Sequence, residues 1–319
     1  MKKHICTLAI VTAILGVLLV GCSPAPEAGR PQDASAGRLH VTVSILPQKY
    51  FLERIGGEHV IVNVMVPPGA DPHTYEPKPD QLVALSRAVA YFTIGVEFER
   101  AWLPRITAAN STMRMVDTAQ GIERIPLVAH HMVADHMVAD HDETATPASG
   151  DPHQAAEDLD PHIWTSPELA KVQARTIYAA LAQVDPAHQA AYQANLDSFV
   201  ADIDQLETDI RAALAGARSH KFMVFHPSWG YFARDFGLEQ IPVEVGGQEP
   251  SAAELAALIS EARANGIKVI FAQPEFSTRA AETIAREIGG HVLLIDPLAE
   301  DWLANLRQVA EAFAGVLAD

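Results

Sequence analysis

Cysteine is nearly absent from this sequence. The 319 residues include only Cys6 and Cys22, and Cys6 falls in an N-terminal segment that we expect to be removed. The mature chain can therefore form no internal disulfide, although we expect it to reach an oxidising compartment. Packing and hydrogen bonding must hold the fold without covalent cross-links.

Positive charge is also scarce. The chain has 23 Lys and Arg against 40 Asp and Glu, a net charge of −17. Removal of residues 1–21 would take away Lys2 and Lys3 and no acid, leaving 21 basic residues and a net charge of −19. Such a surface argues against nucleic acid as a partner and is compatible with cations.

Long apolar runs are missing except at the N-terminus. Ile5 to Val20 is an apolar run of sixteen residues behind Lys2 and Lys3. This is shorter than the roughly 20 residues of a membrane-spanning helix. We therefore interpret residues 1–21 as a cleaved export signal rather than an anchor. The run ends on LVGC at 19–22, which resembles the lipobox of bacterial lipoproteins and predicts a lipidated Cys22, followed by a flexible tether over 22–38.

The rest of the chain alternates strand and helix patterns. This order predicts an α/β fold with parallel sheets in two domains, 39–184 and 218–319. The expected strands are 39–45, 60–66, 89–94 and 113–116 in the first domain, and 221–225, 269–272 and 292–295 in the second. Between them, 185–217 predicts one long helix, because apolar residues recur every three or four positions and no glycine or proline interrupts before Gly216. This helix is either a stiff connector or an ordinary core helix.

Histidine is concentrated in one polar segment. Six of the fourteen histidines fall between 130 and 162, at 130, 131, 136, 141, 153 and 162, and eight acidic residues lie in the same tract. A segment so poor in large apolar groups predicts a loop over 129–159. Imidazoles and carboxylates together indicate metal binding. His162 differs from the others because Ile163 and Trp164 follow it, and Ser166 and Pro167 then begin a helix.

Other candidate ligands follow predicted strands. His73 lies in a proline-rich loop after the second strand, His226 ends the strand 221–225, and Asp296 follows the strand 292–295. Ligands of open α/β sheets bind at the carboxyl ends of the strands. A single loop histidine is usually only an exposed side chain. With His162, these residues instead predict a metal site in a cleft between the two domains, with Glu275 as a competitor of Asp296.

Four motifs carry a family resemblance that covers the mature chain. GADPHTYEPKP at 69–79, LDPHIWTSP at 159–167, FHPSWGYFARDFGL at 225–238 and IDPL at 295–298 resemble the cluster A-I solute-binding lipoproteins of bacterial ABC importers, which capture zinc or manganese. The resemblance implies two (β/α)-type domains joined by a rigid helix, a monomeric receptor and an ABC permease as partner. It also implies His73, His162, His226 and Asp296 as metal ligands.

The third position of that ligand set favours zinc. Histidine at 226 is similar to the zinc branch of the family, whereas a glutamate would be similar to the manganese branch. Some zinc receptors have water or a loop glutamate at the fourth position, so Asp296, Glu275 and water stay open. His153 lies in a second Asp-Pro-His tripeptide, but lacks the residues that follow His162.

The expected chemistry is binding rather than catalysis. Three neutral imidazoles and one carboxylate form a tetrahedral zinc set with no open position for a reacting water. No HExxH helix and no nucleophile elbow is present, so we do not expect an enzyme. The alternatives are a manganese or iron receptor on the same scaffold and a surface adhesin or metal buffer.

Overall fold

The computed structural model describes residues 37–127, 159–245 and 247–318. The expected signal segment, almost all of the tether and most of the histidine-rich loop lie outside these residues. Arg38–Asp319 belongs to one compact unit. Across the described ranges, every helix is too short or too polar to span a bilayer.

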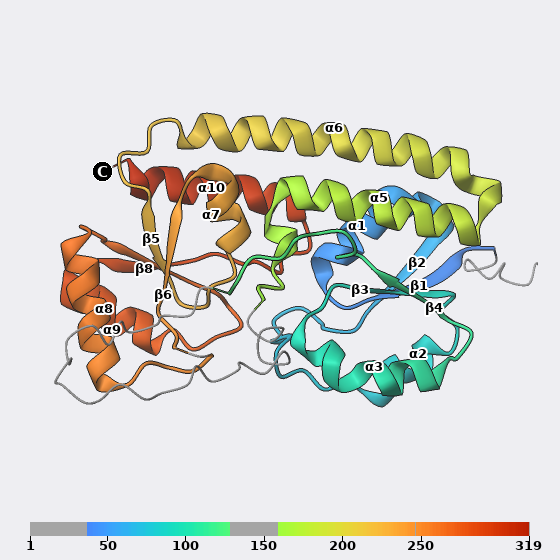
Figure 1. Ribbon diagram of the computed structural model, residues 1–319, viewed down its shortest axis with the longest axis horizontal. Helices are drawn as coiled ribbons and strands as arrows, with labels where there is room; N and C mark the ends of the chain where they lie inside the picture. Colours follow the sequence, from blue (N-terminus) through green and yellow to red (C-terminus); the bar gives the residue numbers. More distant parts are fainter. Residues whose placement is uncertain (1–36, 128–158, 246, 319) are drawn as a thin grey trace, which may run out of the picture. The chain divides into compact units, whose positions relative to one another are not determined.

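The first sheet contains four parallel strands in the order β2-β1-β3-β4. They are β1 (Leu39–Val43), β2 (Val60–Val64), β3 (Ala90–Thr93) and β4 (Arg114–Asp117). Its helices are α1 (Leu46–Gly56), α2 (Pro79–Leu85) and α3 (Glu97–Ala109). In Figure 1, α1 lies on one side of the sheet and α2 and α3 on the other. Both faces are therefore covered, as parallel sheets require.

The second sheet repeats this strand order. It runs β6-β5-β7-β8, again all parallel, with β5 (Lys221–Val224), β6 (Glu239–Pro242), β7 (Val269–Ala272) and β8 (His291–Leu294). Its helices are α7 (Gly230–Phe236), α8 (Ala252–Ala264), α9 (Arg279–Ile288) and α10 (Trp302–Leu317). Figure 1 places α8 and α9 on one face and α7 and α10 on the other. The prediction of an α/β fold with two parallel sheets is confirmed.

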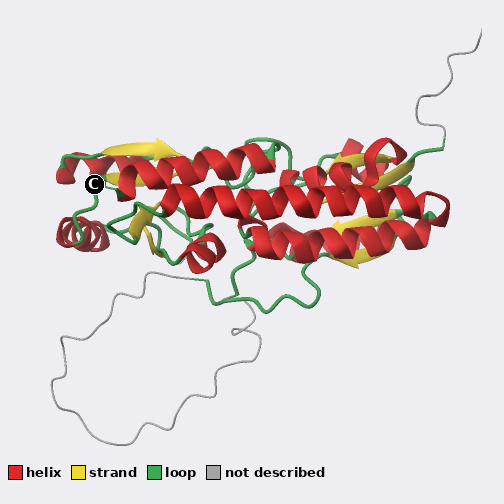
Figure 2. Ribbon diagram, turned by 90° about the horizontal axis from the view of Figure 1, so that it is seen from above, coloured by secondary structure: helices red, strands yellow, loops and turns green. Residues whose placement is uncertain are grey.

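A long helix connects the two sheets. After α5 (Pro167–Val184), a 3₁₀ turn at Pro186–His188 leads into α6 (Gln189–Leu214), which has 26 residues and a length of about 39 Å. Its buried positions follow the predicted spacing: Tyr192, Leu196, Phe199, Ile203, Leu206 and Ile210. Figure 2 shows α6 running nearly straight, and it packs against α1, α5 and α10.

The two sheets share a hydrophobic core along this helix. Phe51 of α1, Phe199 of α6 and Trp302 of α10 meet edge to face or tilted, with Phe51 and Trp302 ring centroids 5.0 Å apart. A second cluster, which includes Met223, Leu258, Ile270 and Ile284, lies between the second sheet and the helices α8 and α9. The halves are therefore joined by packed side chains as well as by α6. The division at 39–184, 185–217 and 218–319 stays a prediction.

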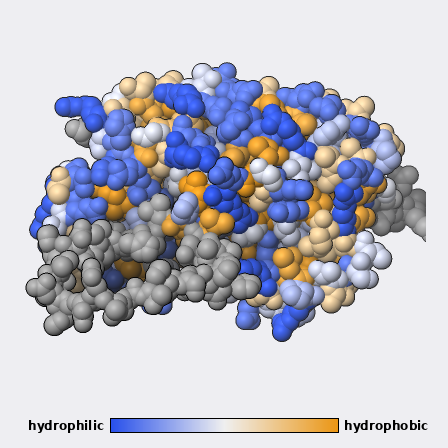
Figure 3. All heavy atoms as spheres, viewed as in Figure 1, coloured by the Kyte–Doolittle hydropathy of each residue, from blue (hydrophilic) through white to orange (hydrophobic). Residues whose placement is uncertain are grey.

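The described surface is largely polar. On the face shown in Figure 3, hydrophilic residues are interspersed with small hydrophobic areas. Large hydrophobic residues that are clearly exposed are scattered through the described ranges, at Val83, Val89, Met115, Leu159 and Leu294. Such scattered positions are normal for a globular surface and identify no docking site.

A buried carboxyl group in the first half provides a test of the fold. Glu99 is 2% exposed and accepts hydrogen bonds from the backbone N–H groups of Ile94 (3.0 Å) and Gly95 (2.8 Å) and from the Ser44 hydroxyl. Burial raises the pKa of Glu99 to about 7, and the hydrogen bonds from Ser44 and the backbone only partly oppose it.

This shift predicts how folding stability depends on pH. Between the unfolded pKa of 4.5 and the folded value of about 7, the folded state holds the proton more tightly, so stability falls as pH rises through that window. The loss should be on the order of 3 kcal/mol, since one pKa unit corresponds to about 1.4 kcal/mol. Urea unfolding at pH 5 and pH 8 should show a smaller decline for Glu99→Gln than for the wild type. Equal declines in unfolding free energy for the two proteins would contradict the assignment of this pH dependence to Glu99.

Candidate metal centre

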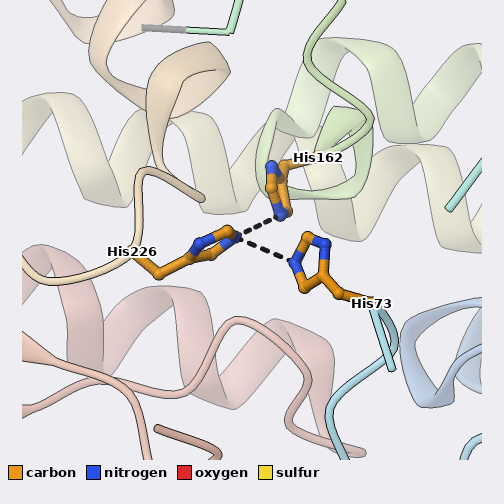
Figure 4. Close-up of side chains that lie close together, drawn as sticks. All are labelled: His73, His162 and His226. Carbon is orange, nitrogen blue, oxygen red and sulfur yellow. Dashed lines mark hydrogen bonds between the residues drawn. The ribbon is translucent and has the colours of Figure 1, made fainter. Parts of the chain in front are cut away.

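Three histidines from distant parts of the chain converge on one point. Nε2 of His226 lies 3.1 Å from Nε2 of His73 and 3.1 Å from Nε2 of His162. Figure 4 shows the three rings directed at one another. One nitrogen of each ring lies within 4.8 Å of the other two. His162 and His226 are 3% and 5% exposed, whereas 23% of the His73 side chain is exposed. His73 therefore forms the accessible side of the cluster.

Asp-Pro-X turns place two of these histidines. The carboxylate of Asp71 accepts the backbone N–H of His73 at 2.8 Å, and Asp160 accepts that of His162 at 2.8 Å. An aspartate that binds the N–H two residues later closes a local turn. The intervening proline fixes its own φ and restricts the residue before it. The motif thus presents the histidine ring from a stiff backbone.

The third histidine is held by the second sheet. His226 follows β5, and its backbone N–H and C=O bond to the Oε1 and Nε2 atoms of Gln273, at 3.1 and 2.6 Å. Phe276 stacks on the His226 ring with centroids 4.9 Å apart. These contacts tie the residues after β5 to those after β7. His226 is therefore fixed in both backbone and ring orientation.

Each histidine has a carboxylate at its other ring nitrogen. Nδ1 of His162 donates to Asp160 at 2.7 Å, and Nδ1 of His226 donates to Glu244 at 2.8 Å. Glu97 lies 2.8 Å from Nδ1 of His73, as an ion-pair contact that lacks hydrogen-bond alignment. An ionised carboxylate only accepts, so it holds the proton on Nδ1 and leaves the Nε2 lone pair free.

This arrangement fits a bound cation. With Nδ1 of His162 and His226 protonated, two Nε2 lone pairs face each other at 3.1 Å and repel unless a proton or a metal ion lies between them. Tetrahedral zinc with Zn–N bonds of 2.0–2.1 Å separates its nitrogen ligands by about 3.3 Å. The surrounding cavity has a volume of only about 10 Å³, which is enough for one small ion or one water but not for an organic substrate.

The local charges act differently on the histidines. Burial lowers the pKa of His226 and outweighs the opposing effect of Glu244. Burial also acts to lower the pKa of His73, but the adjacent Glu97 raises it above its usual value. Burial would raise the pKa of Glu97, yet His73 lowers it to about 2. His226 therefore stays neutral and ready to bind metal, whereas a proton competes more strongly at His73.

The predicted fourth ligand lies beside this group rather than in it. Among the described residues, the three-histidine group does not include Asp296. Asp296 lines a neighbouring cavity of about 120 Å³, while Glu275 lines both that cavity and the histidine cavity. Burial and the charge of Asp296 raise the pKa of Glu275 to about 7, and burial raises the pKa of Asp296. The structure thus places both carboxyl groups next to each other at one edge of the centre.

Sequence reasoning missed the carboxylates that orient the histidines. Asp160 could have been found, because it begins the same Asp-Pro-His motif as His162. Glu97 and Glu244 belong to no motif that we used, and Glu244 follows a strand that the sequence did not reveal. Gly230 was also missed: a Cβ there would lie 2.7 Å from Oδ2 of Asp160. Only glycine leaves room for that carboxylate.

Removing one orienting carboxylate should weaken metal binding. Glu244→Gln keeps the size of the side chain, but the amide offers an uncharged partner to Nδ1 of His226. We expect zinc affinity to fall roughly 10- to 100-fold, the usual effect of losing such an outer partner. Glu239→Gln, on the exposed end of β6, is a matched control that should bind like the wild type. Chelator competition measures both, and unchanged affinity in Glu244→Gln would contradict the role of Glu244.

Sequence comparison finds related zinc proteins. Residues 41–316 match the family described as zinc-uptake complex component A, periplasmic (ZnuA). The chain is 28% identical over 295 residues to the high-affinity zinc uptake system protein ZnuA of Bacillus subtilis (strain 168), which covers 90% of this chain and 87% of that protein. It is 28% identical over 274 residues to the zinc-binding protein AdcA of Streptococcus pyogenes serotype M3, but spans only 52% of AdcA.

Solved structures agree with these relationships. A zinc-bound ZnuA deletion mutant superposes with a TM-score of 0.77 at 46% sequence identity, covering 88% of this chain and 99% of that chain. A second ZnuA crystal structure gives the same values. The similarity therefore extends over both sheets.

Proposed function

Because the chain belongs to the ZnuA family of periplasmic zinc-uptake components, we propose that it is the receptor that captures Zn²⁺ outside the cytoplasmic membrane and delivers it to an ABC permease. The observation that carries this proposal is the convergence of three histidines, with Nε2 of His226 3.1 Å from Nε2 of both His73 and His162, around a cavity the size of one ion. Zinc is the cargo of this site, and no catalytic role is proposed.

The ligand assignment follows from this geometry. We propose that Nε2 of His73, His162 and His226 bind the ion, while Asp160 and Glu244 hold the rings of His162 and His226 in the required tautomer. Glu97 forms an ion-pair contact with Nδ1 of His73. Asp296 stays a prediction as the fourth ligand. The three nitrogen donors favour zinc over manganese, which prefers oxygen ligands and binds more weakly to nitrogen-rich sites.

Metal competition tests the proposed cargo. Purified apo-protein with equal total Zn²⁺ and Mn²⁺ should retain zinc at the cleft and release manganese on gel filtration. Elemental analysis measures the zinc and manganese that remain in the protein fraction. Retention of manganese or iron in place of zinc would favour the alternative receptor on the same scaffold.

The cellular setting of the receptor is proposed from its sequence. A signal segment at 1–21 and a lipidated Cys22 with a tether to residue 38 would hold a monomeric receptor at the membrane, facing the periplasm or the exterior. Of these segments, the structure describes only residues 37 and 38. The acidic composition gives nucleic acid no role in this proposal.

Release of zinc should involve small movements. We propose that 39–184 and 218–319 are two lobes connected by 185–217, and the shared core at Phe51, Phe199 and Trp302 opposes a wide hinge. Trp164 adds a link between the lobes, because its indole N–H donates to the carbonyl of Pro297 at 2.7 Å. Loss of one ligand or a shift of a loop is therefore the proposed route of release.

A further inference from the structure

We propose that a groove between α10 and β8 docks an extended acidic peptide segment of a partner protein, which adds as a further strand to the outer edge of β8. The groove is at the amino ends of β5, β7 and β8, whereas the histidine centre lies beyond the carboxyl ends of the strands. The proposal therefore concerns a surface that zinc binding does not use.

The groove exists because the second sheet is less fully covered than the first. The two sheets share one strand order, so β8 corresponds to β4. In the first half α5 packs against β4, whereas α10 packs along α6, as Figure 1 also shows. Between the C-terminal part of α10 and the sheet, a cavity of about 720 Å³ remains. This volume is in the usual range of ligand sites.

The walls of the groove are partly apolar. Leu293 of β8 and Ala312 and Val316 of α10 line it, and each is only partly buried against the hydrophobic core. Ala312 and Val316 are four residues apart, so they lie on the same face of α10. Apolar side chains that enter the groove would remove this remaining surface from water, which favours binding.

The outer edge of β8 offers backbone groups for a further strand. Among the described strands, β8 pairs only with β7. The backbone N–H of His291 donates toward β7, to the carbonyl of Lys268 at 3.0 Å. Because backbone direction alternates along a strand, the N–H and C=O groups of Val292 and Leu294 point outward. Within the described ranges these outward groups have no hydrogen-bond partner.

The other sheet edges carry features that oppose strand addition. β4 has a charged residue at each end, and β6 begins with Glu239 and ends in Pro242. On β2, the side-chain amide of Gln81 donates to the carbonyl of Val64 at 3.2 Å. β8 has the sequence HVLL, with no proline and no Lys, Arg, Asp or Glu. Its edge is therefore the one best suited to accept a further strand among those described.

The rim of the groove is positively charged, although the whole chain has a net charge of −17. Arg218, Lys221 and Lys268 line the groove, and the acidic lining residue is Glu311. Lys221 is paired with Glu239 at 2.8 Å. Arg218 and Lys268 form no ion pair with any other described residue. Carboxylates of a bound segment would meet these two cations, so the charge of the rim favours an acidic occupant.

The combination of edge, groove and charge specifies the kind of occupant. A strand added beside β8 would direct every second side chain to the face of the sheet that carries α10. Backbone hydrogen bonds would then supply affinity, and the groove and its cations would select the side chains. A small anion could meet the cations but would leave the edge of β8 unpaired.

Peptide binding to the full chain tests this proposal. The probe is a synthetic peptide in which aspartate or glutamate alternates with valine. We expect saturable binding that shifts the backbone amide NMR signals of Val292 and Leu294. The same peptide with lysine in place of the acidic residues should bind at least about tenfold more weakly, as should the acidic peptide with N-methylated backbone amides, which cannot donate to a strand.

Charge-reversal variants test the rim. Arg218→Glu and Lys268→Glu should each weaken binding of the acidic peptide about 3- to 10-fold, because each replaces an attraction by a repulsion. Arg114→Glu is the matched control, since Arg114 is an exposed cation on β4, the equivalent edge strand. It should bind the peptide like the wild type. All three variants should bind zinc like the wild type, and their melting temperatures check that they fold.

Several results would overturn the proposal. Equal binding of the acidic and N-methylated peptides to the wild type would mean that charge alone attracts them and that β8 accepts no strand. Binding of glutarate at the groove without binding of the peptide would identify a small-anion site instead. Peptide binding that occurs only after deletion of 130–158 would identify the chain's own acidic segment as the occupant. Absence of saturable peptide binding in both proteins would leave the groove without the proposed role.

Discussion

Replacing His226 with alanine is expected to lower zinc affinity on the order of a thousandfold. The variant loses one of the three proposed nitrogen ligands, so its effect should exceed the roughly 10- to 100-fold loss typical of an outer partner. It also leaves Glu244 buried without the imidazole N–H that it accepts at 2.8 Å. Isothermal titration of zinc into apo-protein measures the change in zinc affinity. A competing chelator is added where binding is too tight to measure directly.

A loop deletion provides the matched comparison for this prediction. Deleting residues 130–158 removes five histidines from the sequence but none of the three that converge. We expect the deletion to keep the tightest site and to remove only weaker binding. A deletion that abolishes the tightest site while His226→Ala retains it would contradict the assignment of the site to the cleft.

Zinc affinity should fall steeply as the medium becomes acidic. Metal binds the unprotonated Nε2 atoms, so protons compete below the pKa of each histidine. Because Glu97 raises the pKa of His73, competition should begin there as pH falls, whereas the lowered pKa of His226 delays its protonation. Each proton that zinc must displace contributes up to about tenfold in affinity per pH unit.

The expected pH dependence is therefore large and has a defined origin. From pH 7.5 to pH 5.5, the affinity should drop at least about tenfold, and more where two histidines titrate together. Glu97→Gln should shift the onset to lower pH, because it removes the charge that favours protonated His73. Chelator competition at fixed ionic strength measures both proteins. A flat profile, or a shift in the opposite direction, would contradict the role of these imidazoles.

Most secondary structure followed from local patterns. Ser166 caps α5 by accepting the Leu169 N–H at 3.1 Å, at the helix start expected from the sequence. Ser251 forms a capping box with Glu254 at the start of α8. The strand predicted at 269–272 agrees with β7. Such features succeed because the signal and the interaction lie within a few residues.

The predicted long helix is present, and its first turn has a tighter geometry than the rest. Pro186–His188 forms a 3₁₀ turn that runs directly into α6 at Gln189. The Asp185 carboxylate, which the sequence suggested as the helix cap, instead accepts from Nδ1 of His188 at 2.6 Å and from the Tyr192 hydroxyl at 2.7 Å. Side-chain partners within the first turns thus displaced the expected backbone cap.

Elements without a periodic signal were not found. We predicted neither α2 nor α7, and β6 was missed because Glu239–Pro242 is short, begins with a charge and ends in proline. Proline is tolerated there because β6 is at the edge of its sheet. Since Glu244 follows β6, missing the strand also concealed the partner of His226. Residues that become neighbours only on folding, such as His226 and Glu244, can be identified only from the folded structure.

The histidine centre was more predictable than its surroundings. His73, His162 and His226 carry distinctive local motifs, and the structure brings their rings together. The surroundings of the two carboxyl groups include hydrogen bonds from Asn305 to the carbonyl of Asp296 and from Trp164 to the carbonyl of Pro297, which no local pattern reveals. The sequence could therefore name Asp296 and Glu275 as candidates without choosing between them.

X-ray absorption at the zinc edge, on protein purified without added metal, tests the central claim most directly. We predict one tightly bound zinc per chain with three imidazole nitrogens at about 2.0–2.1 Å. The signal should lose imidazole scattering in His226→Ala. A bound zinc surrounded by oxygen ligands alone, or one whose spectrum is unchanged in that variant, would contradict the claim that these three histidines hold the cargo.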